Sequence, residues 1–171
     1  YLHQTKSSID DPEKLANKVS KSDKKIVNEA LKEAEEAMVY NEVPIGAVIV
    51  KDGEIIAVAR NEREETNKAT SHAEIIAIEQ ANKELKSWRL DTCTMYVTIE
   101  PCPMCAGAII QSRMKNVVYG AKDVKAGCHE SIVRLFDKSF NHKVNIIGGV
   151  LENECSEILT NFFKKIRSKN I

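Results

Sequence analysis

The sequence predicts an α/β fold in which one sheet is layered with helices. Runs rich in valine and isoleucine alternate with stretches of helical periodicity, and the second half of the chain keeps a strand–helix order throughout. The 171 residues, 43% of them hydrophobic, can form one core of ordinary size and are too few to argue for two. We therefore expect one domain over residues 23–171, preceded by a polar, disordered arm over residues 1–22.

The first predicted elements are a helix and a β-hairpin. Between residues 23 and 40, apolar residues recur at helical spacing among lysines and glutamates, as is typical of an amphipathic helix lying on a core. VPIGAVIV (43–50) and IIAVARN (55–61) read as two strands. The dipeptide Asp52-Gly53 between them favours a tight hairpin turn.

Helices and strands then alternate. A helix containing His72 comes first, then a buried strand over TMYVTI (94–99), then a helix that opens at Pro101 to Cys105. The remaining predicted elements are a strand KNVVYGA (115–121), a helix ESIVRLFD (130–137), a strand KVNIIGGV (143–150) and a closing helix CSEILTNFFKKIR (155–167).

Composition limits the classes of partner. Twenty-five basic residues balance twenty-five acidic ones, so no overall field draws the chain to nucleic acid or to an anionic membrane, and any such partner must be met locally. No apolar run is long enough to span a bilayer, and the first residues lack the order of a secretory signal. We expect no membrane association and a cytoplasmic location. Five cysteines with an internal C-x-x-C suit a reducing compartment and a metal or redox role.

Two short motifs carry chemistry, and the first is PCPMC. Cys102 and Cys105 are three residues apart, which brings two side chains onto one face of a helix, and Pro101 and Pro103 fit a first helical turn. Both sulfurs would then lie at the positive end of the helix dipole. That position favours the thiolate, which is the form that binds a metal.

The second motif is HAE. His72 and Glu74 point to nearly opposite sides of a regular helix, so both serve one site only if the site faces the first turn of that helix. One histidine and two cysteines are three soft ligands, as in a catalytic zinc site that keeps its fourth position open for water. Glu74 would then be free to accept a proton from that water.

The cysteines of this chain also have other interpretations. A C-x-x-C alone can be a redox pair, although the surrounding sequence lacks the short βαβ context of a thioredoxin. Cys93, Cys128 and Cys155 are expected to be small buried residues, with Cys128 the one conceivable fourth ligand. Taken together, H-x-E followed about thirty residues later by P-C-x-x-C matches the signature of zinc nucleobase deaminases.

The segments EVPIGAVIV, ARN, HAE, SWRL, TMYVTIEPC, MCAGAI, VVYGA and FFKKIR resemble the bacterial TadA-type tRNA adenosine deaminases from about residue 24 to the end of the chain. This resemblance implies a three-layer α/β/α cytidine-deaminase-like fold with a central five-stranded mixed sheet, and a homodimer. The implied reaction is hydrolysis of adenosine to inosine at the wobble position, with a tRNA anticodon stem-loop as substrate.

The same resemblance implies roles for individual residues. The residues that would hold one Zn²⁺ per subunit are His72, Cys102 and Cys105. Glu74 would relay protons, and Asn61 would bind the extruded nucleoside. The backbone N–H groups of Ala73 and Cys102 would steady the oxygen at the reacting carbon, and Asp123 would contact a ribose hydroxyl of a neighbouring nucleotide.

Two alternatives stay open. The PCPMC form, with Pro103, resembles some free-base deaminases such as guanine deaminase, so a deaminase of free guanine or cytosine is the second interpretation. A non-catalytic, zinc-bearing partner subunit is the third, and retention of Glu74 argues against it. His129 and Glu130 stand where the TadA-type family usually has small residues.

The C-terminal segment FFKKIRSKN bears on this choice because it carries four positive charges and no acid. Such a local patch suits RNA, whereas a free-base enzyme does not need it. An ordinary helix end, where the dipole favours cations, explains the same pattern. The cations are Lys164, Lys165, Arg167 and Lys169, and Lys122, Lys125 and Arg134 could extend the surface.

Overall fold

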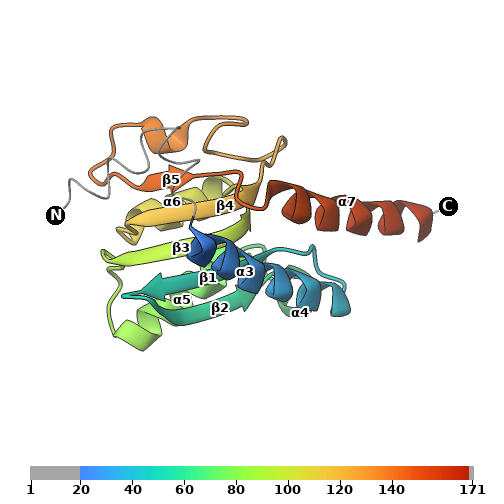
Figure 1. Ribbon diagram of the computed structural model, residues 1–171, viewed down its shortest axis with the longest axis horizontal. Coiled ribbons are helices and arrows are strands. Elements are labelled where there is room, and N and C mark those ends of the chain that lie inside the picture. Colours follow the sequence, from blue (N-terminus) through green and yellow to red (C-terminus); the bar gives the residue numbers. More distant parts are fainter. Residues whose placement is uncertain (1–19, 170–171) are drawn as a thin grey trace.

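The structure is a computed structural model that describes residues 20–169, and its centre is a five-stranded mixed sheet with the order β2-β1-β3-β4-β5 (Figure 1). β1 pairs antiparallel with both β2 and β3, whereas β3, β4 and β5 run parallel to one another. The strands are β1 (Gly46–Lys51), β2 (Glu54–Arg60), β3 (Cys93–Ile99), β4 (Asn116–Ala121) and β5 (Asn145–Ile147). The predicted fold class is confirmed.

Asp52 and Gly53 form the hairpin turn between β1 and β2, as predicted. Both have positive φ angles, of 50° and 79°, and the residues on either side, Lys51 and Glu54, are paired. This backbone conformation matches the twist of a two-residue hairpin, and glycine adopts it without strain.

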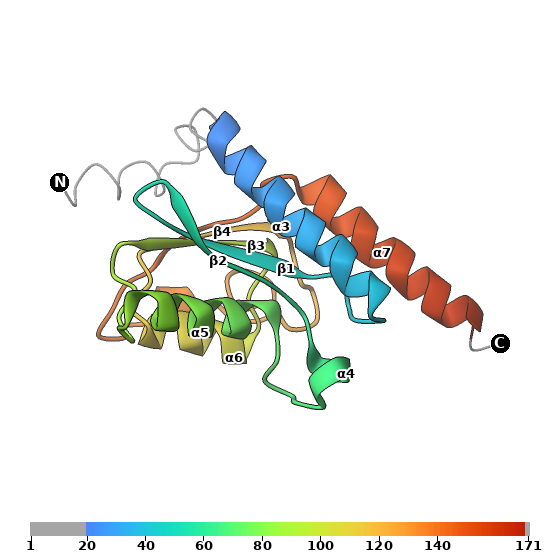
Figure 2. The same ribbon diagram turned by 90° about the horizontal axis from the view of Figure 1, so that it is seen from below.

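Helices cover both faces of the sheet (Figure 2). α3 (Lys21–Val39) and α7 (Glu152–Lys169) lie on one face, and α5 (Ala73–Leu85) and α6 (Pro103–Gln111) lie on the other. Alternate strand residues divide between two cores: Val48 packs with the α3 and α7 layer, and its neighbour Ile49 packs with the α5 and α6 layer.

α3 begins two residues earlier than predicted. Ser20 caps it by accepting the backbone N–H of Asp23 at 3.1 Å, and the Asp23 carboxylate accepts the backbone N–H of Ser20 at 3.2 Å. This reciprocal pair satisfies two N–H groups that have no partner within the helix, so the helix starts at Lys21. The predicted arm lies outside the described residues for residues 1–19.

The predicted helix over residues 130–137 is wrong. The structure has only one turn of 3₁₀ helix there, Leu135–Asp137, and the residues before it form a loop. The N–H of Leu135, which would bond to the carbonyl of Ser131 in that helix, bonds to the carbonyl of Cys128 at 3.0 Å, and the N–H groups of His129, Glu130 and Ser131 bond to the carboxylate of Glu100. A one-turn helix that was not predicted, α4 (Arg63–Thr66), follows β2.

Candidate metal and deaminase site

The candidate site lies where the N-termini of α5 and α6 meet. His72 is the N-cap residue of α5, and Cys102 is the N-cap residue of α6, within the predicted opening at Pro101 to Cys105. Pro103 takes the first helical position of α6, where a missing N–H costs nothing, and Cys105 follows in the first turn. Both N-cap residues have an extended backbone and lie at helix N-termini, where the dipoles favour negative charge.

The three predicted ligands come together in space. The Nδ1 atom of His72 lies 3.5 Å from Sγ of Cys102 and 3.4 Å from Sγ of Cys105, and all three atoms lie within 4.8 Å of one another. A tetrahedral zinc with ordinary Zn–S and Zn–N bonds would separate its sulfur and nitrogen ligands by roughly 3.5 Å. The donor set therefore fits such an ion and leaves a fourth position open.

Without a metal, hydrogen bonds among the three side chains shift their pKa values. A hydrogen bond from the Cys105 thiol, together with His72 and against the effect of burial, lowers the pKa of Cys102 to about 4. The same hydrogen bond, burial and the charge of Glu74 raise the pKa of Cys105, and the bond to Cys102 raises the pKa of His72. A metal ion that binds here must displace these protons, so its binding strengthens as pH rises.

Glu74 is buried beside this cluster, with 2% of its surface exposed. Its Oε1 atom makes no hydrogen bond to any of the described residues. Burial raises the pKa of the Glu74 carboxyl, although the charge of His72 opposes the shift. Buried polar atoms are nearly always satisfied, so an unpaired carboxylate oxygen at this place indicates a partner such as water or substrate. Glu74 is not one of the three candidate metal ligands, so its carboxyl group is free to move a proton.

Asn61 follows β2 and is also buried, with 3% of its surface exposed. Its Oδ1 atom accepts the backbone N–H of Ala73 at 3.0 Å, so Asn61 caps α5 from outside that helix. The Ala73 N–H, which the family resemblance assigns to the reacting oxygen, is donated to Asn61 in this structure.

Asp123 shapes its own loop. Its Oδ1 atom accepts the backbone N–H groups of Lys125 and Ala126, each at 3.1 Å. The predicted contact of Asp123 with a ribose hydroxyl stays a prediction.

A cavity of about 370 Å³ opens beside Asn61 and extends to α7. Its walls include Arg63, Lys68 and the exposed side chains of Phe163 and Ile166. The predicted tail cations lie on the same last turns of α7 and are exposed. Cations and an exposed aromatic ring beside a buried amide are suited to a single-stranded nucleic acid, whose bases stack and whose phosphates need positive charge.

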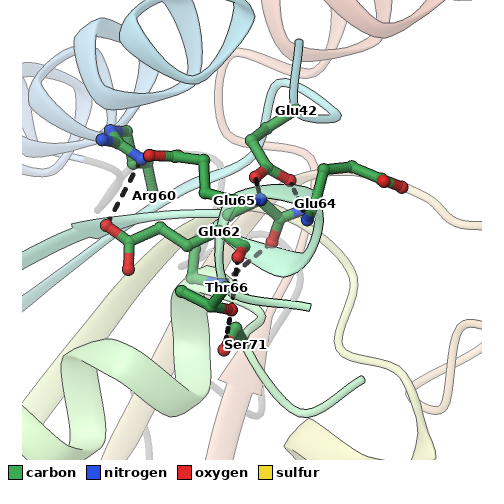
Figure 3. Close-up of polar contacts among 9 residues, drawn as sticks. Glu42, Arg60, Glu62, Glu64, Glu65, Thr66 and Ser71 are labelled. Atoms are coloured by element: carbon green, nitrogen blue, oxygen red, sulfur yellow. Dashed lines mark hydrogen bonds and ion pairs between the residues drawn. The ribbon is translucent and has the colours of Figure 1, made fainter. Parts of the chain in front are cut away.

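Arg63 and Glu42 were not among the predicted site residues. The Nη1 atom of Arg63 lies 3.3 Å from Nε2 of His72, on the side of the ring opposite the cysteines. Glu42, which is 1% exposed, accepts the backbone N–H groups of Glu64 at 3.0 Å and Glu65 at 2.8 Å (Figure 3). The sequence gives no local signal for these contacts, because Glu42 lies 22 residues or more from its partners.

Ion pairs and hydroxyl groups also hold the segment from residue 62 to residue 71. The Arg60 guanidinium lies 2.6 Å from the Glu65 carboxylate and 3.3 Å from that of Glu62 (Figure 3). Thr66 donates to the carbonyl of Glu62 at 2.6 Å and bonds Ser71 at 3.0 Å. These contacts place one wall of the cavity beside His72.

Known deaminases are similar to this chain over most of its length. The family profile described as MafB19-like deaminase matches residues 21–167. A tRNA-specific adenosine deaminase from Bacillus subtilis is 49% identical over 148 residues, which are 86% of this chain and 92% of that protein.

In the described part of the chain, no helix has the length and apolar character needed to cross a membrane.

Two solved structures are also similar. One, from work on A-to-I editing by tRNA:A34 deaminases at the wobble position of transfer RNA, is 45% identical with a TM-score of 0.75 and covers 77% of this chain and 96% of its own. A guanine deaminase from Bacillus subtilis is 34% identical with a TM-score of 0.55, covering 67% of this chain and 84% of its own.

Proposed function

Since the chain belongs to the MafB19-like deaminase family, we propose that it is a hydrolase that converts adenosine to inosine at the wobble position of a tRNA anticodon loop. One observation carries the reaction type: a His72, Cys102 and Cys105 cluster beside a buried carboxylate with an unpaired oxygen. The choice of adenosine in tRNA rests on the similarity to tRNA-specific adenosine deaminases over most of the chain.

Zn²⁺ is the metal proposed for the cluster, one ion per subunit. The ligand set is soft, has the spacing of a tetrahedral site and leaves one position open, which is the arrangement of a catalytic zinc. A bound zinc supplies one thing here: it lowers the pKa of a water molecule toward neutrality.

The residues of the chain then move protons and hold the base. Glu74 accepts a proton from the water and delivers it to N1 of adenine as the water oxygen bonds to C6. Glu74 then takes the proton of the new hydroxyl group at C6 and passes it to the exocyclic nitrogen, the C6–N6 bond breaks as the C6 carbonyl forms, and ammonia leaves. Asn61 orients the nucleoside beside the cavity that residues of the segment 62–71 help to line. An anticodon loop is a suitable substrate because its bases are already unpaired.

Assembly as a homodimer is part of the proposal. The surface exposes several large apolar side chains that a partner subunit could cover: Trp88, Ile132, Val133 and Phe140. Sedimentation of the purified chain at several concentrations tests this, and a monomer at all of them would contradict it.

A free-base deaminase is the second candidate for two reasons. The PCPMC motif resembles that of some guanine deaminases, and a solved guanine deaminase is 34% identical to this chain. The deciding experiment offers the zinc-loaded protein an anticodon stem-loop with adenosine at the wobble position and, separately, free guanine and free cytosine. Inosine in the stem-loop is the expected result, and a stem-loop with guanosine at that position is the control. Ammonia from a free base, with no inosine in RNA, would overturn the proposal.

A further inference from the structure

Glu100 is a buried carboxylate that the proposed reaction does not use. It follows the last residue of β3, Ile99, precedes Pro101 and Cys102, and is 1% exposed. Its side chain therefore sits within the same turn of chain that delivers a metal ligand.

Five donors from one loop converge on this carboxylate. Oε1 accepts the backbone N–H of Asp123 at 3.1 Å and the hydroxyl of Ser131 at 2.5 Å. Oε2 accepts the backbone N–H groups of His129 and Glu130, each at 2.9 Å, and that of Ser131 at 3.1 Å. Bonds to an ionised acceptor are about twice as strong as neutral ones, so this set binds both ends of the loop to one side chain.

The loop is shaped for this contact. A Cβ atom at Gly127 would overlap the Glu100 carboxylate, so only glycine allows the backbone to pass. The backbone N–H of Cys128 bonds to the carbonyl of Pro101 at 2.9 Å, which ties the middle of the loop to the residue before Cys102. The loop and the metal-binding turn are thus joined by side-chain and backbone bonds.

The outer side of this loop presents groups that suit RNA. Lys122 and Lys125 are exposed, and Val124 is 73% exposed. The Asp123 side chain is bound within the loop by two backbone N–H groups. Small movements of the loop relative to Cys102 would move these groups relative to the reacting base.

We propose, on the basis of the tRNA deaminase function above, that Glu100 is a positioning residue: it holds the loop of residues 122–131 at a fixed distance from Cys102, so that RNA bound on the loop places its base at the metal. A carboxylate is required because five donors need two acceptor oxygens. A glutamine offers one oxygen, and its NH₂ group would face N–H donors.

The test compares Glu100→Gln with Glu84→Gln, the same substitution at an exposed position of α5 outside the loop. In Glu100→Gln we expect the KM for the stem-loop to rise about tenfold with a smaller change in kcat, stoichiometric zinc, and faster hydrogen exchange at residues 128–131. Glu100→Asp should raise KM less than Glu100→Gln does, because it keeps two acceptor oxygens, and Glu84→Gln should behave like the wild type.

Ser131→Ala is the second variant, since it removes one donor and leaves the carboxylate in place. It should give an intermediate rise in KM, and it decides the matter if Glu100→Gln does not fold. Unchanged KM values in both variants, or loss of zinc as the only defect of Glu100→Gln, would overturn the inference. Hydrogen exchange is measured without RNA, so an inactive wild type would refute the proposed function while the effect of Glu100 on the loop is still read directly.

Discussion

The side-chain oxygen of Asn61 lies 3.0 Å from the backbone nitrogen of Ala73 and accepts its hydrogen. This bond joins the end of β2 to the first residue of α5, directly between His72 and Glu74 in the sequence. Asn61 can therefore affect catalysis in two ways: it holds the helix that carries Glu74, and its NH₂ group can bind substrate.

Two substitutions separate these effects. Asn61→Ala should lower the free energy of unfolding by about 1 kcal/mol through loss of the cap, and should lower kcat/KM on the order of a hundredfold. Asn61→Asp keeps an acceptor for Ala73 but loses the NH₂ donor, so it should keep stability and lose activity. Thermal unfolding and stem-loop kinetics measure both. Full activity of Asn61→Asp would exclude a donor role, and full activity of Asn61→Ala would exclude both roles.

Glu74→Gln should bind zinc stoichiometrically and lose deamination by about 10²- to 10⁴-fold, because glutamine keeps the shape of the side chain but carries no proton in the cycle. Zinc analysis and single-turnover rates with the stem-loop check this. Glu79→Gln is the control, since Glu79 is exposed on the same helix. Substantial turnover by the zinc-loaded Glu74 variant would remove this residue from the mechanism.

Cys102→Ser and Cys105→Ser should each lose zinc and activity together, and a chelator should reproduce the loss in the wild type. Cys128→Ala should keep zinc, because Cys128 lies outside the group of three ligand atoms. The cluster also holds protons that zinc must displace, so zinc affinity should fall as pH is lowered. Retention of zinc in both serine variants would refute the ligand assignment.

Replacing Lys164, Lys165, Arg167 and Lys169 with glutamine should weaken stem-loop binding and flatten its dependence on salt. Each phosphate that a cation neutralises releases counterions, so fewer contacts give a shallower slope. Binding is measured at several salt concentrations, with single-turnover rates at saturating enzyme expected to stay near those of the wild type.

The matched control for the tail variant removes four exposed cations from α3: Lys21, Lys24, Lys25 and Lys32. Three of them lie in the first turns of that helix, far from the end that adjoins α4 (Figure 2). An equal change of slope in both variants, or no change in the tail variant, would show that the tail is an ordinary helix end.

Glu42→Gln should lower the free energy of unfolding by about 1–3 kcal/mol, because one of the two N–H groups that α4 donates to Glu42 would lose its acceptor. The cavity wall should loosen, and kcat/KM for the stem-loop should fall. Glu64→Gln keeps the backbone donor and serves as the control. Equal stability of the Glu42 variant and the wild type would contradict a supporting role for this buried carboxylate.

Much of the fold could be predicted from short stretches of sequence. The Asp52-Gly53 turn, the strands and the long helices are set by local preference and by the period of apolar residues, which a single sequence displays. The HAE and PCPMC motifs likewise predict a metal site, because a histidine and two cysteines at the starts of helices are a typical set of zinc ligands. The start of α3 at Lys21 could also have been predicted, because Ser20 and Asp23 have the spacing of a capping box.

The tertiary structure decided where a group from a distant part of the chain overrides or supports the secondary structure that a segment prefers by itself. Residues 130–137 have the composition of a helix, but the N–H of Leu135 bonds to the carbonyl of Cys128, outside that segment, and Glu100, about thirty residues away, accepts the N–H groups of His129, Glu130 and Ser131. Glu42 supports α4 in the same way from 22 residues away. The hydrogen bond from the backbone N–H of Ala73 to Asn61 likewise cannot be predicted from either segment alone, because the two residues come together only in the folded chain. A local sequence pattern shows which backbone hydrogen bonds a segment can make. Only the folded chain places a buried acceptor from another segment where it can take those N–H groups.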